Sequence, residues 1–166
     1  MTQFMTHQTI HVDSTDLESS FHSSEMDLRK QLVRFGKWVH RLGYTPGTAG
    51  NLSVRLDEHL ILATPTGCSK GLLRVADIVL IDNEGLKLAG ARNVTSEIGM
   101  HLAVYRMRPD VQAIVHTHPP IATAFAACGK ALDQPICSEI LMTTGLVPLA
   151  PYATTGTEEV SASLEP

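Results

Sequence analysis

The chain is poor in cysteine and has no strong basic charge. Its 166 residues include only Cys68, Cys128 and Cys137, and none of these is spaced as C-x-x-C. An odd number of cysteines without paired spacing argues against a disulfide framework and fits a reducing compartment. The formal net charge is -4 at pH 7, so nucleic acids and anionic membranes are poor candidate partners. An anion site would have to be built locally, from backbone N–H groups or single cations.

Long apolar segments are also missing. The N-terminal stretch MTQFMTHQTIHVDSTDLESSFHSSEMD has no apolar core and no basic start, unlike a signal peptide. No apolar run is long enough to span a bilayer, so we expect a cytoplasmic protein. Residues 1–25 are rich in Ser, Thr and His without periodicity and are expected to form a disordered tail. Residues 26–166 are enough for one domain with its own core.

The remaining sequence alternates between helix and strand patterns. Apolar residues recur at helical spacing over 26–43, with Gly43 where a C-cap is expected. The other expected elements are strands over 51–56, 60–63, 78–81, 86–90 and 111–118, helices from Thr95 or Ser96 to 107, over 119–130 and from 156 onward, and short strands and loops over 139–156. Hairpin strands flanked by helices predict an α/β sandwich with a mostly antiparallel or mixed sheet.

The stretch VQAIVHTHPP (111–120) carries two histidines at the end of an expected strand. Side chains alternate across a strand, so His116 and His118 point to the same face, at a separation that suits two imidazoles binding one ion. A bare His-x-His is equally compatible with two polar residues at a strand end, and catalytic zinc usually has three protein ligands. None of the other six histidines is a convincing third ligand.

Glu97 and His101 lie four residues apart in an expected helix, so they share a helix face and can pair. We expect His101 to be structural, as helical histidines near an acid often are. Glu97 in the first turn fits two roles: a favourable interaction with the helix macrodipole, or a general base near a bound substrate. Spacing alone does not separate these roles.

Three stretches combine small residues with hydroxyl or amide side chains: GTAGN (47–51), TPTGCS (64–69) and NVTSE (93–97). Such segments let backbone N–H groups point at an anion, and the third opens a helix whose N-terminus favours negative charge. Each alone is more often a simple turn. Three of them next to strand or helix ends in one domain indicate a phosphate ligand.

In chain order, the motifs GTAGNLSVR, ATPTGCSKG, TSEIGMHLAVYRMRPDVQAIVHTHPP and PLAPYATTGT resemble the class II aldolase/adducin family, from about residue 26 to the end. Within that family, the L-fuculose-1-phosphate aldolases are the most similar enzyme type. The resemblance implies a three-layer α/β/α sandwich around a mostly antiparallel, mixed sheet. It also implies a divalent metal, usually zinc, a phosphorylated sugar substrate and homotetramers with sites at subunit interfaces.

The resemblance assigns roles to individual residues as well. It implies that His116 and His118 are metal ligands, and that Glu97 serves as acid/base and touches the metal in the resting enzyme. The phosphate-binding positions that it implies are Gly50, Asn51, Thr66, Gly67, Thr95 and Ser96. The expected reaction is retro-aldol cleavage of a ketose phosphate between C3 and C4, giving dihydroxyacetone phosphate and an aldehyde, with the metal stabilising the charge that develops.

Two departures from the family pattern accompany the resemblance. The family's third metal histidine lies beyond the helix that follows YATTGT, whereas this chain ends at Pro166, so we expect the domain to be C-terminally incomplete. The region CSEILMTTG holds no Tyr, although the fuculose enzymes have an aromatic catalytic residue there. The alternatives are a methylthioribulose-phosphate dehydratase, a sugar-acid decarboxylase, an inactive adducin-like scaffold and, less favoured because epimerases have Asp in place of Glu97, a 4-epimerase.

Overall fold

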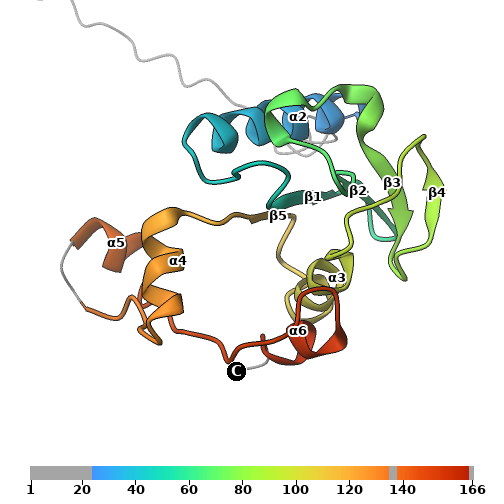
Figure 1. Ribbon diagram of the computed structural model, residues 1–166. Coiled ribbons are helices and arrows are strands. Elements are labelled where there is room, and N and C mark those ends of the chain that lie inside the picture. Colours follow the sequence, from blue (N-terminus) through green and yellow to red (C-terminus); the bar gives the residue numbers. More distant parts are fainter. Residues whose placement is uncertain (1–23, 135–137, 165–166) are drawn as a thin grey trace, which may run out of the picture.

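The computed structural model of the chain describes residues 24–134 and 138–164 (Figure 1). The disordered tail expected over residues 1–25 lies outside the described residues, except for its last two. Of these, Ser24 is the N-cap of the first helix, and its side chain accepts a hydrogen bond from the backbone N–H of Asp27. A serine in this position satisfies one of the free N–H groups of the first turn. The helix therefore begins at Glu25.

Five strands form one sheet in the order β4-β3-β2-β1-β5, and every neighbouring pair is antiparallel. The strands are β1 (Asn51–Arg55), β2 (Leu60–Ala63), β3 (Val79–Asp82), β4 (Lys87–Ala89) and β5 (Ala113–His116). The α/β class with a mostly antiparallel sheet is thus confirmed. The register sets Asn51, the first residue of β1, opposite His116, the last residue of β5. That end of the sheet carries the candidate site.

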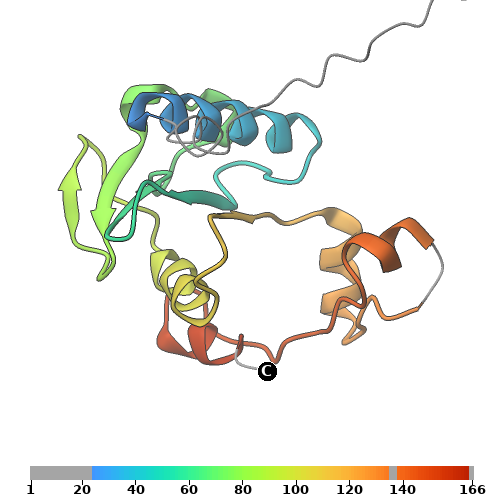
Figure 2. The same ribbon diagram turned by 180° about the vertical axis from the view of Figure 1, so that it is seen from behind.

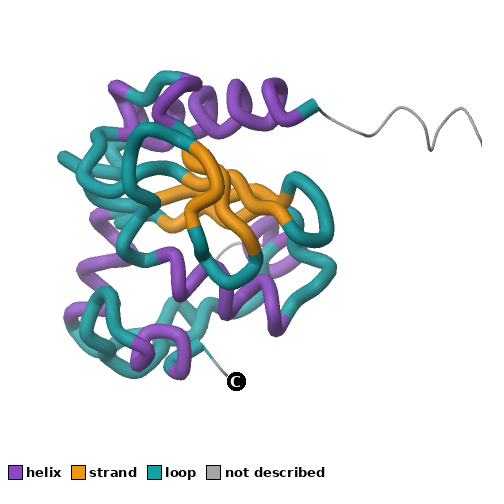
Figure 3. The backbone as a smooth tube through the Cα atoms, turned by 90° about the vertical axis from the view of Figure 1, so that its right-hand side faces the viewer, coloured by secondary structure: helices purple, strands orange, loops and turns teal. Residues whose placement is uncertain are grey.

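Helices cover both faces of the sheet. Helix α2 (Glu25–Arg41) lies on one face and α3 (Ile98–Met107) on the other, and Figures 1 and 2 show these two layers from opposite sides. The same layering is visible edge-on in Figure 3, where the strands lie between helices above and below them. The short helix α6 (Glu158–Ala162) packs against α3 on the side away from the sheet. The expected three-layer arrangement is therefore present.

Alternating side chains divide the core into two clusters, one on each face of the sheet. On β2, Leu62 joins the cluster under α2, while Ile61 joins the cluster under α3. Both side chains are fully buried, and burying a residue of this size stabilises the fold by roughly 1.5–3 kcal/mol. This period-two alternation is what a strand buried on both faces requires.

The C-terminal third differs from its prediction in one element. Helix α4 (Pro120–Ala127) follows β5 and has a proline in its first turn, as expected. Short strands and loops were predicted over 139–156, but Ser138–Thr143 form helix α5. The hydroxyl of Thr143 donates to the carbonyl of Glu139, four residues earlier, and Leu and Met in this segment are good helix formers. Among the described residues, no helix is both long and apolar enough to cross a membrane.

Candidate active site

The two histidines of the HTH motif lie together where β5 ends. His116 closes the strand, and the chain then turns so that the backbone N–H of His118 donates to the carbonyl of Tyr44 at 2.7 Å. The ring centroids of His116 and His118 are 4.9 Å apart. Both residues are half-buried. The structure therefore brings these two side chains together, as the alternation along the strand predicted.

The Glu97 side chain also lies beside His116, although it comes from the start of helix α3 and not from β5. It is the N-cap residue of α3, and its Oε2 lies 3.2 Å from Nδ1 of His116. The same oxygen accepts a hydrogen bond of 2.5 Å from Nδ2 of Asn51. The Glu97 side chain is 17% exposed, so solvent reaches it only in part. A carboxylate, an imidazole and an amide thus share one small site.

Asn51 is the centre of this arrangement. Its Oδ1 lies 2.5 Å from Nε2 of His101 and 3.3 Å from Nδ1 of His116. Asn51 itself is only 2% exposed. We expected His101 and Glu97 to be able to pair along one helix face, but the contact between them runs through the Asn51 amide. The expectation that His101 is structural agrees with its complete burial.

The hydrogen bonds of His101 continue into the core. Its Nδ1 lies 2.7 Å from the hydroxyl of Ser53, which lies 2.8 Å from the hydroxyl of Tyr105. Burial, and secondarily the nearby His116, lowers the pKa of His101 to about 4, so the ring is neutral at pH 7. Burial likewise raises the pKa of Tyr105 to about 12. Both groups are therefore uncharged partners at neutral pH.

The direction of each hydrogen bond follows from these contacts. The Asn51 amide nitrogen donates to Glu97, so its oxygen is the acceptor that faces His101. A neutral imidazole carries one proton, so the proton of His101 lies on Nε2 and Nδ1 accepts from Ser53. Ser53 in turn accepts from Tyr105. The result is a one-way series of hydrogen bonds that starts in the core and ends on the Glu97 carboxylate.

The protonated nitrogen of His116 can be assigned from its hydrogen-bond acceptors in the same way. Its Nδ1 faces two acceptor oxygens, one of Glu97 and one of Asn51. Burial is the main cause that lowers the pKa of His116, and the Glu97 charge opposes it. In the neutral ring, the proton on Nδ1 is donated toward these oxygens, which leaves the lone pair on Nε2. Carboxylate partners commonly fix metal-binding histidines in this way.

The three expected phosphate segments are linked to one another. Pro65 and Val94 form an antiparallel bridge, and Thr95 N–H donates to the carbonyl of Thr64. The first segment approaches the site through Gly50, at φ 71°, where an added Cβ would lie 2.7 Å from the carbonyl oxygen of His116. Only glycine fits such a close approach in this left-handed conformation. All three segments therefore converge beside the histidines.

The six expected phosphate positions differ in exposure. Thr66, Gly67 and Ser96 are exposed, whereas Gly50, Asn51 and Thr95 are buried. The Asn51 side chain is occupied by Glu97 and the histidines. A phosphate contact at Asn51 would therefore come from its backbone.

Lys70 is a site residue that the sequence did not single out. It follows directly after the second segment, and its Nζ donates to the carbonyls of Thr48 and Cys68 at 2.8 Å each. It is only 1% exposed. The available signal was its position as the first basic residue after TPTGCS, but a single lysine in a loop normally indicates a solvated side chain.

The side chains present can supply donors to a divalent metal. Nε2 of His118 is buried without a hydrogen-bond partner among the described residues, and a buried imidazole nitrogen in that state fits a ligand position. Two imidazoles and a carboxylate are donors that zinc accepts. Within residues 24–134 and 138–164, however, no three His, Cys, Asp or Glu side chains gather closely enough to form a metal site on their own.

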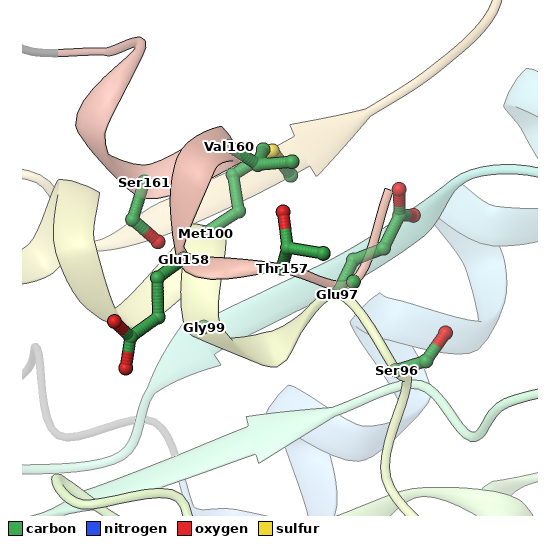
Figure 4. A pocket seen from close by; sticks show the side chains of 9 residues that line it. Ser96, Glu97, Gly99, Met100, Thr157, Glu158, Val160 and Ser161 are labelled. Atoms are coloured by element: carbon green, nitrogen blue, oxygen red, sulfur yellow. The ribbon is translucent and has the colours of Figure 1, made fainter. Parts of the chain in front are cut away.

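A small cavity of about 150 Å³ lies beside this site, between the N-terminus of α3 and α6. Figure 4 shows Glu97 and Ser96 on one side of it and Thr157 and Glu158 on the other. The described residues that line it include two carboxylates and no Lys, Arg or His. Such a lining does not suit a phosphate, so the three segments rich in glycine and hydroxyl residues remain the better candidates for binding that group.

Known proteins share this architecture. A solved L-fuculose 1-phosphate aldolase superposes with a TM-score of 0.77 at 34% identity, covering 87% of this chain and 68% of that one. The 3-oxo-tetronate 4-phosphate decarboxylase of Haemophilus influenzae is 36% identical over 146 residues, which cover 85% of this chain and 69% of that protein. The 5-methylthioribulose-1-phosphate/5-deoxyribulose-1-phosphate aldolase of Rhodospirillum rubrum is 39% identical over 138 residues, 83% and 62% of the two chains.

The chain thus spans roughly two thirds of the length of the curated relatives that it matches, 69% and 62% of these two. The family model for the class II aldolase and adducin N-terminal domain matches residues 30–166. That match covers nearly the whole described structure, including every residue of the candidate site. The chain belongs to the class II aldolase and adducin N-terminal domain family.

Proposed function

We propose that this chain carries the active site of a metal-dependent lyase that breaks a carbon–carbon bond in a phosphorylated keto-sugar, with an L-fuculose-1-phosphate-like substrate as the first candidate. The observation that carries the proposal is the position of Glu97, 3.2 Å from His116 and next to three linked anion-binding segments. An acid/base group, a candidate metal ligand and a candidate phosphate site lie within one site. This combination supports an enzyme over an adducin-like scaffold.

The metal in this proposal is Zn²⁺ or another divalent cation held by His116 and His118. Glu97 would join them as a further ligand in the resting state only if its carboxylate moved away from Nδ1 of His116, which it faces here. Its contribution would be Lewis-acid stabilisation of negative charge on the substrate's carbonyl oxygen. The unpartnered Nε2 of His118 supports this assignment. The choice of Zn²⁺ as the metal belongs to the same proposal.

Glu97 moves the proton in the proposed reaction. When the C3–C4 bond breaks, its electron pair stays with C3, the Glu97 carboxylate takes the proton of the C4 hydroxyl, and an aldehyde leaves. The same carboxyl group, which is partly exposed, then returns this proton to C3 and so gives dihydroxyacetone phosphate. The donated N–H of Asn51 fixes the carboxylate for this transfer.

The phosphate of the substrate is proposed to bind the exposed parts of the three segments. Thr66 and Ser96 offer hydroxyl groups there, and Gly67, at φ 63°, lets the backbone approach a ligand closely. The start of α3 adds the favourable field of a helix N-terminus. The remaining proposed phosphate-binding positions are buried: Gly50, Asn51 and Thr95.

Decarboxylation is a second candidate, favoured by the 36% identity to a 3-oxo-tetronate 4-phosphate decarboxylase. Its substrate is a β-keto acid, and loss of CO₂ leaves the electron pair on the carbon beside the ketone, as the retro-aldol step does. CO₂ departs without exchanging a proton, so no aromatic acid/base residue is required at the leaving group. Protonation of the remaining carbon again gives dihydroxyacetone phosphate.

Because both reactions yield the same product, one assay tests both. The chain is loaded with Zn²⁺ and incubated with L-fuculose 1-phosphate or with 3-oxo-tetronate 4-phosphate, and dihydroxyacetone phosphate is measured by an enzyme-coupled assay, with separate detection of aldehyde and CO₂. Release that depends on Glu97, tested with Glu97→Gln, supports the lyase. Product from neither substrate, in this chain and in one extended at its C-terminus, would overturn the proposal. The cytoplasmic location and tetrameric assembly stay predictions.

A further inference from the structure

Lys70 is a buried cation whose side chain has no carboxylate partner among the described residues. It begins the short 3-10 helix η1 (Lys70–Leu72), and the whole residue is 1% exposed. Its Nζ donates two hydrogen bonds of 2.8 Å each, to the backbone carbonyls of Thr48 and Cys68. Within the described part of the chain, no Asp or Glu forms an ion pair with it. A buried ammonium whose hydrogen bonds all go to neutral carbonyls costs folding free energy. A function of the charge would explain why a lysine occupies this position.

The surrounding packing prevents this side chain from swinging into solvent. Helix α2 lies directly against η1. An added Cβ at Gly36 would lie 2.8 Å from Cδ1 of Leu73, and one at Gly71 would overlap the ring of His40. The two glycines thus let helix and loop approach closely enough to enclose Lys70.

The Lys70 charge lies beneath the candidate site. The two carbonyls that it binds belong to the first and second anion-binding segments, which it joins. Its field reaches both sides of the site: the Glu97 charge raises the pKa of Lys70, and the Lys70 charge lowers that of His116. Burial is the larger influence on the Lys70 ammonium and lowers its pKa overall. An anion nearby would relieve this penalty.

We propose that Lys70 provides the fixed positive charge of the anion site, and that the substrate's phosphate group is its counter-ion. This inference rests on the proposed function and names the residue that makes the site favour a doubly charged group. Lys70 acts as a positioning and electrostatic residue, since it holds two segments together while its charge attracts the ligand over them. If Lys70 only cross-linked the two loops, a neutral hydrogen-bond donor at this position would serve equally well.

The test separates the charge from the cross-link. Binding of inorganic phosphate to the 166-residue chain is measured by calorimetry and compared with Lys70→Gln, which keeps N–H donors without the charge, and Lys70→Met, which removes both. The matched control is Lys30→Gln, because Lys30 is an exposed lysine paired with Asp27. We expect both Lys70 variants to bind phosphate about tenfold more weakly or worse, and the control to stay within about twofold.

A second measurement needs no variant to fold. In the wild-type chain with ¹³Cε-labelled lysine, saturating phosphate should raise the pKa of Lys70, because linkage is reciprocal. Wild-type affinity in Lys70→Gln, or an unchanged Lys70 titration with phosphate bound, would overturn the inference and leave the proposed function intact. If the wild-type chain binds no phosphate, both this inference and the sugar-phosphate part of the proposed function fail.

Discussion

Nε2 of His101 lies 2.5 Å from Oδ1 of Asn51, and the amide nitrogen of the same side chain donates to Glu97 at 2.5 Å. The Glu97 carboxylate only accepts hydrogen bonds, so it decides which way the amide faces. The Asn51 oxygen therefore faces His101, which donates to it from Nε2, and the amide links a fully buried histidine to a carboxylate that it does not touch. The reversed amide would place a carbonyl oxygen against a carboxylate oxygen.

Replacing His101 by alanine should therefore cost stability. The substitution leaves a cavity and unpaired polar groups on Ser53 and Asn51, and these effects together cost about 2–4 kcal/mol. Denaturant unfolding of the variant and of the wild type measures the difference. His59→Ala is the matched control, because His59 is exposed, and it should change stability by less than about 0.5 kcal/mol. Equal midpoints for His101→Ala and the wild type would contradict this.

The stability should also depend on pH through His101. The pKa of a histidine is 6.5 in the unfolded chain and falls to about 4 here. Between these values the unfolded chain binds more protons, so the stabilisation is complete above pH 6.5 and is lost as pH falls toward 4, by roughly 3 kcal/mol. In His101→Gln this part of the pH dependence should disappear. An identical slope in the two proteins between pH 4 and 6.5 would show that His101 is not its source.

Gly50 should tolerate alanine less well than Gly47. Both have positive φ, 71° and 56°, so alanine strains the backbone at either position by about 1 kcal/mol. Only at Gly50 would the new Cβ also collide, at 2.7 Å, with the His116 carbonyl and with Thr45. We expect Gly50→Ala to be the more destabilising, by at least about 1 kcal/mol. Thermal unfolding of the two variants measures this, and equal losses would argue against the close approach.

The ion pairs of Asp77 and of Asp110 should differ in their contribution to stability because the two carboxylates differ in exposure. Asp77 is 4% exposed and binds Arg74 and Arg92, and the Arg74 hydrogen bond is the main cause that lowers its pKa to about 2. Asp110 pairs with Arg108 at 2.6 Å in solvent. Asp77→Asn should cost about 1–3 kcal/mol at pH 7, and Asp110→Asn close to zero. Below about pH 4 the Asp77 difference should shrink, since that stabilisation is lost as pH falls through the folded pKa.

Local patterns predicted much of the fold. Apolar spacing located α2 to within two residues at each end, and strand alternation correctly placed His116 and His118 side by side. Glycine and hydroxyl residues marked three segments that lie near one another in the structure, and their role in phosphate binding stays a prediction. These features depend on neighbours in the sequence, so the sequence alone contains the information that defines them.

The roles of Asn51 and Lys70 depend on long-range contacts instead. Asn51 meets partners 46, 50 and 65 residues away, and Lys70 reaches back 22 residues to Thr48. No periodicity encodes such distances. The helix α5 was missed for a different reason, since SEILMT is too short for a helical repeat to be distinguished from a strand.

The most direct test of the account is a zinc titration of the metal-free chain by calorimetry. The wild type should bind one Zn²⁺ per chain, His118→Ala should lose this binding because it removes the unpartnered Nε2, and His59→Ala should bind as the wild type does. No binding by the wild type at micromolar zinc, or equal binding by His118→Ala, would contradict the claim that the two histidines hold the metal of a sugar-phosphate lyase.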